Sequence, residues 1–427
     1  MSRNHQENEF DAIVVGSGAC GATIARELSR QNKRVLILER GGNAPLKESF
    51  MAILVIADEV KLGADGLSTV RAITTGGSTS LYFGVVNYPP LDVFRAVGID
   101  LSEDLEKVKA ELPIAPLPDE LLTAQGRRLR DAAVAMGHAW KKNDMLIDSS
   151  KCASGYSYES KWKARSYVDE AVQNGAVLIN RATVHKIIVD NNAAVGVEYR
   201  VKKSLFGSEV RQAYASKIVL AAGELASPKI LRDSGVRGVG DRGFYCNPGY
   251  AIYGIVPGLD GTSGFVGSMG CVYEDGIELG DANLPKPLHR PMMLGGLKLR
   301  QLLSFPETIG IGVKVKDGLG GELKEDGRFH KSFDREDLSK LEKGKREAIR
   351  ILEKTGAKHI VDFGLTAAGR VGGLVRIGEH LDRNLETQYR NLHVCDGSVI
   401  PDDMRGTPTI TLVCLGKYLS RHLLSES

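Results

Sequence analysis

The chain has 427 residues, and at the usual size of domains this length favours two or three domains. Hydrophobic residues make up 42% and charged residues 26% of the sequence, which excludes a disordered chain, a collagen and a disulfide scaffold. The net charge of +3 is too small to indicate nucleic-acid binding. None of the six cysteines stands in a CxxC motif, so we predict no zinc ribbon, no clustered iron–sulfur site and no other metal.

The segment Met1–Glu9 is polar and lacks the apolar core of a secretory signal. No stretch approaches the roughly 18 uninterrupted apolar residues that a membrane-spanning helix needs. We therefore expect a cytoplasmic protein without an integral membrane segment.

The first forty residues predict a strand, a turn, a helix and a second strand. Phe10–Val15 and Val35–Leu38 are short apolar runs, which suit strands that are buried on both faces. Between them Ile24, Ala25 and Leu28 recur at helical spacing. This βαβ unit implies a parallel sheet.

Prolines separate helical patches in the next mixed segment, residues 89–149. Apolar periodicity then predicts helices over 164–175, 229–233, 337–354 and 410–423, and strands over 176–180, 183–189, 194–199, 218–222 and 392–396. The glycine-rich, alternating segment 246–330 suits an antiparallel sheet.

The turn after the first predicted strand carries a dinucleotide fingerprint, Gly16-x-Gly18-x-x-Gly21. Gly16 allows the tight turn, Gly18 lets a pyrophosphate approach the backbone, and Gly21 lets helix and strand pack closely. The N-terminus of the helix offers N–H groups to the phosphates. Glu39, at the end of the second strand, is placed to accept a hydrogen bond from the adenosine ribose.

The fingerprint alone does not distinguish NAD from FAD, but three further motifs do. They are the glycine turn Thr74–Ser80, the strand–turn–helix segment Ala221–Leu231, and Val394–Pro401 followed by Thr407–Thr411. In these motifs and their order the chain resembles the glucose–methanol–choline (GMC) family of FAD oxidoreductases.

The resemblance implies roles for further residues in binding FAD. It implies contacts with the flavin and its pyrophosphate, with adenine, with the ribityl chain and with the flavin pyrimidine. The residues are Gly76, Gly77, Ser78, Val184, Ala222, Gly223, Asp396, Thr407, Pro408 and Thr409. Leu81 and Tyr82 stand where some family members carry a histidine that tethers FAD, so we predict non-covalent FAD.

The sequence departs from the family where the catalytic base is expected. The family has His-x-x-Gly where this chain has Thr366-Ala-Ala-Gly369, and a His or Asn where this chain has Thr407. Threonine hydroxyls donate hydrogen bonds but are not bases near neutrality. His359, seven residues before Thr366, could be displaced into the site or could be a histidine without a role.

Charged residues flank both of these positions. Arg370 and Arg405 either bind an anionic substrate or stabilise reduced flavin, or they are structural arginines. Asp402 and Asp403 could serve as a base or could form a solvated turn. We take Thr366, Thr407, Arg370 and Arg405 as the candidate catalytic residues.

Together these features predict an α/β protein with a discontinuous, doubly wound, Rossmann-like FAD-binding domain, residues 1–88, 150–245 and 360–427. A smaller α+β substrate domain, residues 89–149 and 246–359, would carry the antiparallel sheet. We predict a dehydrogenase that transfers hydride from a CH–OH group of a small molecule to flavin N5 and passes electrons to a protein or quinone. The alternatives are a flavoprotein that acts reductively or on a C–C bond, and a flavin-binding protein without alcohol turnover.

Overall fold

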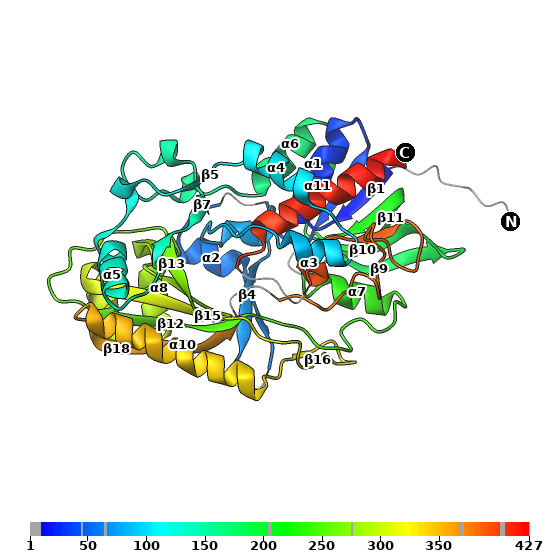
Figure 1. The fold of residues 1–427 in the computed structure, drawn as a ribbon. Coiled ribbons are helices and arrows are strands. Elements are labelled where there is room, and N and C mark those ends of the chain that lie inside the picture. Colours follow the sequence, from blue (N-terminus) through cyan, green and yellow to red (C-terminus); the bar gives the residue numbers. More distant parts are fainter. Residues whose placement is uncertain are drawn as a thin grey trace.

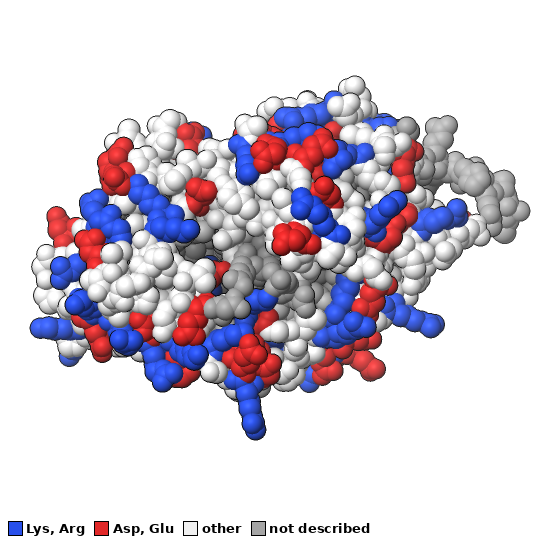
Figure 2. All heavy atoms as spheres, viewed as in Figure 1, with Lys and Arg blue, Asp and Glu red and all other residues white. Residues whose placement is uncertain are grey.

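The computed structural model describes residues 10–43, 46–63, 66–203, 207–274, 276–367, 371–401 and 406–426. Two sheets with separate hydrophobic cores organise these residues. Figure 1 shows the parallel strands with α1, α6 and α11 in one lobe, and the antiparallel sheet with α10 along its outer face in the other. Positive and negative side chains are interspersed over the face seen in Figure 2, in keeping with the small net charge.

The first sheet has seven strands in the order β8-β2-β1-β11-β10-β9, and β19 also pairs with β11. The strands β8, β2, β1, β11 and β19 run parallel, whereas β9, β10 and the first half of β11 form antiparallel pairs. The strands are β1 (Phe10–Val15), β2 (Val35–Glu39), β8 (Val177–Asn180), β9 (Ala182–Asp190), β10 (Ala193–Lys202), β11 (Ser208–Leu220) and β19 (Leu392–Val394). The parallel part confirms the predicted α/β fold, because crossovers through helices link its strands.

The second sheet is antiparallel throughout, in the order β18-β12-β15-β14-β13-β6. Its strands are β6 (Lys141–Lys142), β12 (Pro248–Ile255), β13 (Met269–Glu274), β14 (Ile277–Asp281), β15 (Thr308–Val315) and β18 (Lys358–Ala367). Three two-stranded antiparallel sheets accompany these two sheets: β3 (Ala57–Lys61) with β4 (Ser68–Ala72), β5 (Ile114–Pro116) with β7 (Asp144–Leu146), and β16 (Glu322–Leu323) with β17 (Phe329–His330).

Helices cover both cores. They are α1 (Ala19–Arg30), α2 (Phe50–Ile56), α3 (Leu91–Ala96), α4 (Ser102–Glu111), α5 (Ala124–Ala135), α6 (Arg165–Gln173), α7 (Ser227–Asp233), α8 (Lys286–Gly295), α9 (Leu299–Leu303), α10 (Arg335–Lys354) and α11 (Thr409–Ser425). α1 packs against α6 and α11 above the parallel strands, and α10 packs on β12, β14 and β15. No helix within these described ranges has the length and apolarity needed to cross a membrane.

The bounds of the two predicted domains stay a prediction. Two segments, however, pack with the sheet of the other predicted domain. Strand β18 pairs with β12, so residues 360–367 belong to the antiparallel sheet. The side chains of Phe94, Leu105 and Val108 are buried in the core of the parallel sheet, although residues 89–149 were assigned to the substrate domain. In both cases tertiary packing decides the partner, which local sequence patterns do not reveal.

Candidate functional site

The fingerprint turn joins β1 to α1 and needs glycine at two positions for packing. Gly16 has a φ of 100°, and a Cβ atom there would lie 2.3 Å from the carbonyl oxygen of Ala221. A Cβ on Gly21 would lie 2.1 Å from the carbonyl oxygen of Gly16. A Cβ on Gly18, in contrast, would meet no described atom within 4 Å. Gly18 therefore leaves open space at the start of α1, where a phosphate group would approach the backbone.

The N-terminus of α1 is suited to an anion. Among the described residues no side chain caps it, and its first turn carries no acidic residue. Because the first N–H groups of a helix lack partners within the helix, an uncapped N-terminus binds phosphate through these groups and the helix dipole.

Glu39 ends β2 beside this turn, with its side chain almost fully buried. Its Oε2 accepts hydrogen bonds from the Ser17 amide at 3.1 Å and the Ser17 hydroxyl at 2.5 Å, and its Oε1 accepts from the Gly41 amide at 2.6 Å. The Ser17 hydroxyl in turn accepts from the Gly76 amide at 3.1 Å. Ser17 thus links the fingerprint, Glu39 and the second glycine turn, a role that its place inside the fingerprint could have suggested. The contact of Glu39 with ribose stays a prediction.

The second glycine turn lies directly against the fingerprint. Gly76 and Gly77 have φ angles of 90° and 58°, and a Cβ on Gly77 would lie 3.0 Å from the Cα of Gly18. The Ser78 hydroxyl accepts from the Ala72 amide, so it anchors the turn to β4. The Ser80 hydroxyl is buried and has no hydrogen-bond partner within the described part of the chain. A polar group of a bound cofactor would satisfy such a buried hydroxyl.

Asp396 joins the turn after β11 to the turn after β19. Its carboxylate accepts hydrogen bonds from the Gly223 amide at 3.0 Å, from the Ser398 amide at 2.9 Å and from the hydroxyls of Ser227 and Ser398. The Ser227 hydroxyl also accepts from the Ala222 amide at 3.2 Å. Burial raises the pKa of Asp396, and these hydrogen bonds act in the opposite direction. Asp396 therefore positions this corner of the site, and its contact with the ribityl region stays a prediction.

A second uncapped helix N-terminus completes the site. α11 begins at Thr409 after Pro408, again without a side-chain cap among the described residues. The Thr407 amide donates to Asn87 Oδ1 at 2.6 Å, and its hydroxyl donates to the Val85 carbonyl at 2.6 Å. The first turns of α1 and α11 are adjacent, since Cys20 Sγ lies 3.2 Å from the Leu412 carbonyl. Nothing in the sequence indicated that Asn87 holds this segment.

Val184 lies farther out in the sheet, on β9, where it is buried and pairs with Tyr199. The segment just before β9 reaches the site, because Asn180 Nδ2 donates to the Gly41 carbonyl at 3.2 Å and to the Thr75 hydroxyl at 2.9 Å. The backbone contact of Val184 with adenine stays a prediction.

The candidate catalytic residues are only partly described. Thr366 is exposed on β18, and its hydroxyl donates to the Ser68 carbonyl at 3.3 Å. Arg370, Arg405, Asp402 and Asp403 lie outside the described residues. His359, in contrast, lies near the start of β18, roughly 23 Å along the strand from Thr366, with its Nδ1 2.7 Å from Nη1 of Arg300. The structure thus separates His359 from Thr366.

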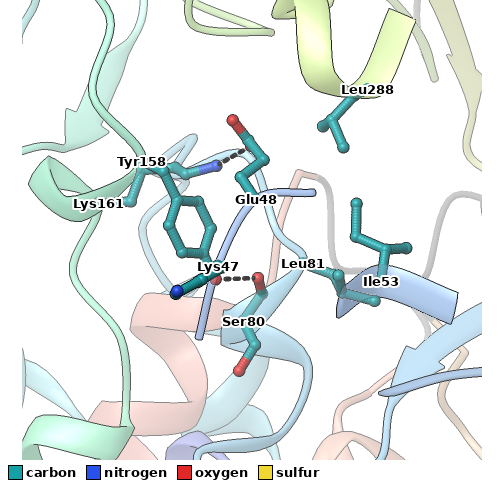
Figure 3. A pocket seen from close by; sticks show the side chains of 8 residues that line it. All are labelled: Lys47, Glu48, Ile53, Ser80, Leu81, Tyr158, Lys161 and Leu288. Carbon is teal, nitrogen blue, oxygen red and sulfur yellow. Dashed lines mark hydrogen bonds and ion pairs between the residues drawn. The ribbon is translucent and has the colours of Figure 1, made fainter. Parts of the chain in front are cut away.

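A small pocket, partly open to solvent, lies beside the second glycine turn. Figure 3 shows the side chains that line it: Lys47, Glu48, Ile53, Ser80, Leu81, Tyr158, Lys161 and Leu288. Ser80 ends the turn that Gly77 begins and Leu81 follows it, so the second glycine turn reaches the pocket.

Buried ionisable groups form one wall of this pocket. Lys161 Nζ lies 3.2 Å from Glu48 Oε1, and the Tyr156 hydroxyl donates to the same carboxylate at 2.6 Å. Burial lowers the pKa of Lys161, and it lowers the pKa of the neighbouring Lys163 to about 8. The Tyr158 hydroxyl donates to the Ser80 carbonyl at 2.8 Å. The pocket therefore combines apolar side chains with a paired charge.

Comparison with known proteins places this arrangement in a family. The chain matches the family described as GMC oxidoreductase over residues 10–242, which is more than half of its length. The chain belongs to the GMC oxidoreductase family. The matched range contains both glycine turns, and Asp396 lies outside it.

Individual GMC proteins are similar at low identity. The long-chain-alcohol oxidase FAO3 of Arabidopsis thaliana is 23% identical over 97% of this chain and 67% of its own length. The (R)-mandelonitrile lyase 1 of Prunus serotina is 27% identical over 54% of this chain, which spans only 44% of the lyase. The crystal structure of a pyridoxine 4-oxidase from Mesorbium loti matches with a TM-score of 0.71 at 16% identity, over 97% of this chain and 99% of that one. The similarity to the pyridoxine 4-oxidase structure shows that the two proteins share a fold.

FAD is the cofactor of this GMC oxidoreductase, and the described residues fit it. Two uncapped helix N-termini, the open space at Gly18 and the orphaned hydroxyl of Ser80 converge on one region. The amides at the start of α1 would hold the pyrophosphate. Non-covalent attachment stays a prediction.

Proposed function

We propose that the protein is an FAD-dependent dehydrogenase that removes hydride from a CH–OH group of a small substrate and transfers it to flavin N5. The observation that carries this proposal is the open backbone at Gly18, which lies against Gly77 and beside the pocket wall that begins at Ser80. Membership in the GMC family supports the same chemistry.

The chain's own residues would contribute positioning and electrostatics. FAD, when bound, supplies the ring that accepts hydride. The N–H groups at the start of α11, from Thr409 onward, would stabilise negative charge on the flavin pyrimidine. Leu81, Ile53 and Leu288 would make apolar contacts with the substrate, while the Lys161–Glu48 pair would orient its polar part.

Removal of the substrate's hydroxyl proton needs a base other than threonine, and we propose Asp402 or Asp403 as the carboxylate that takes this proton. The Thr407 hydroxyl donates to the Val85 carbonyl, and Thr366 carries only a hydroxyl as well.

We propose that Arg370 or Arg405 holds an anionic substrate group or the reduced flavin. An electron-accepting protein or quinone and a cytoplasmic location also remain proposals.

The proposal is tested by following the flavin absorbance anaerobically while alcohols, sugars and hydroxy acids are added. We expect one class of compound to bleach the band. Leu288→Ala should raise the half-saturating concentration of that compound up to about tenfold, because it removes apolar contact in the pocket. Leu338→Ala, a change at an exposed leucine on α10, should leave it unchanged.

If no donor bleaches a fully bound flavin, the dehydrogenase proposal is wrong. That result would support a second candidate function, a flavoprotein that acts reductively or on a C–C bond. Such chemistry needs no base to remove a hydroxyl proton. The lyase among the relatives favours this candidate, because its name describes no oxidation. A flavin-binding protein without turnover would give the same silent spectrum and no product with any compound.

A further inference from the structure

An apolar surface lies on neighbouring helices next to the pocket. Among the described residues, the five most exposed large hydrophobic side chains all belong to it, with exposures of 60–86%, whereas those elsewhere reach at most 58%. We call this the leucine-rich patch; it consists of Met51, Leu54 and Val55 on α2, and Leu294, Leu297, Leu299 and Leu303 on α8, α9 and their link. α2 contacts α8, and α8 contacts α9, so the three helices adjoin. Exposed apolar groups at this density mark an interaction site.

The segment that carries α8 and α9 has charge of one sign. Between residues 282 and 306 the sequence has four basic residues and no Asp or Glu. The basic residues are Lys286, Arg290, Lys298 and Arg300. A short segment with exposed leucines and only positive charges has the composition of a helix that lies in the interface of an anionic bilayer.

The backbone also projects one leucine outward. Leu297 links α8 to α9 with a φ of 55°, in the left-handed region that side chains other than glycine rarely adopt, and it is 80% exposed. A polar residue such as asparagine tolerates this conformation better and would avoid exposing apolar area. A leucine at this position is favourable if its side chain is buried when a partner covers this surface.

We propose that the leucine-rich patch docks the protein on the surface of an anionic lipid bilayer. The apolar side chains would enter the boundary between headgroups and acyl chains, and the four basic side chains would contact the lipid headgroups. A second copy of this chain fits less well, because an isologous contact would bring two sets of like charges together. The helices are too short to span the bilayer, so the protein would lie on it.

The docked surface adjoins the pocket. α2 contributes Ile53 and α8 contributes Leu288 to the pocket lining, on the same helices that carry the patch. If the proposed function holds, an apolar substrate or a quinone could pass between bilayer and pocket without crossing bulk water. This step rests on the proposed function, whereas docking itself does not.

The test is co-flotation of the FAD-loaded protein with phospholipid vesicles. We expect binding to phosphatidylcholine vesicles that contain roughly one third phosphatidylglycerol, little binding to pure phosphatidylcholine, and weaker binding at high salt. Leu297→Asn with Leu303→Asn should lower the partition coefficient at least about tenfold, since two exposed leucines no longer enter the membrane. Lys286→Gln with Arg290→Gln should also lower it about tenfold or more, and only on anionic vesicles.

The matched control is Leu338→Asn with Val272→Asn, which changes two exposed apolar side chains outside the patch and should bind like the unaltered protein. Flavin absorbance in each variant verifies its fold. No binding to anionic vesicles, or equal binding by the leucine variant, overturns the proposal. A dimer that light scattering detects without lipid, and that the leucine variant dissociates, would assign the patch to a second copy instead.

Discussion

Gly18→Ala is expected to lower the affinity for FAD at least about tenfold, or about 1.4 kcal/mol, while the protein still folds. The added methyl group would meet no described atom within 4 Å, so the chain itself tolerates it. It would project into the open space beside Gly77, where the pyrophosphate must approach the backbone at the start of α1. Titration of the apoprotein with FAD, followed by flavin fluorescence, measures the affinity.

Gly318→Ala provides the matched control. A Cβ on Gly318 also meets nothing within 4 Å and its backbone is not left-handed, but this glycine follows β15. Equal FAD affinities of the two variants would show that the space at Gly18 does not hold the cofactor. Unfolding of the Gly18 variant, seen in its circular dichroism, would contradict the packing of this turn.

Asp281→Asn is expected to change the pH dependence of stability in the antiparallel lobe. Asp281, at the end of β14, is buried, and its carboxylate accepts from the Met269 amide at 2.7 Å and the Ser268 hydroxyl at 3.2 Å. Burial raises its pKa from 3.8 to about 7, against the effect of these hydrogen bonds. Asparagine keeps the acceptor oxygen and cannot ionise.

The sign follows from proton linkage. Because the pKa of Asp281 is raised in the folded protein, protonation of Asp281 stabilises the fold. This stabilisation is complete below about pH 4 and is lost as the pH rises through about 7. The free energy of unfolding of Asp281→Asn, relative to the unaltered protein, should therefore rise by about 3 kcal/mol between pH 5 and pH 8. Urea unfolding of both proteins at a series of pH values measures this difference in the free energy of unfolding. A difference that does not vary with pH would contradict the account, and Asp260→Asn, at an exposed carboxylate, should show no such trend.

Local sequence patterns predicted the elements that are periodic and buried. β1, α1 and β2 lie where apolar runs and the glycine fingerprint placed them, because a strand buried on both faces and a helix with one apolar face leave clear periods. The patterns missed α2, α8 and α9. In α8, Pro287, Pro291 and the glycines that follow obscure the helical period, and the exposed Leu294 weakens the contrast between a buried and an exposed face.

The cofactor site was predictable where the chemistry fixes the residue type. Gly16 and Gly21 have backbone neighbours that exclude a side chain, and such positions are visible as a motif. Asn87 and Ser227, which hold Thr407 and Asp396, were missed because a single polar side chain acting across a long sequence separation leaves no pattern. For the same reason the sequence did not show that Lys161 meets Glu48 in one wall of the pocket, or that Tyr156 donates to this carboxylate from behind it.

The most direct test of the central claim is the visible spectrum of the purified protein, followed by acid precipitation and analysis of the supernatant. If the glycine turns, Asp396 and the two uncapped helix N-termini hold FAD without a covalent bond, the protein is yellow, and acid releases about one FAD per chain into the supernatant. A colourless protein that gains no flavin band when FAD is added would contradict the account, and flavin that stays in the pellet would contradict non-covalent attachment.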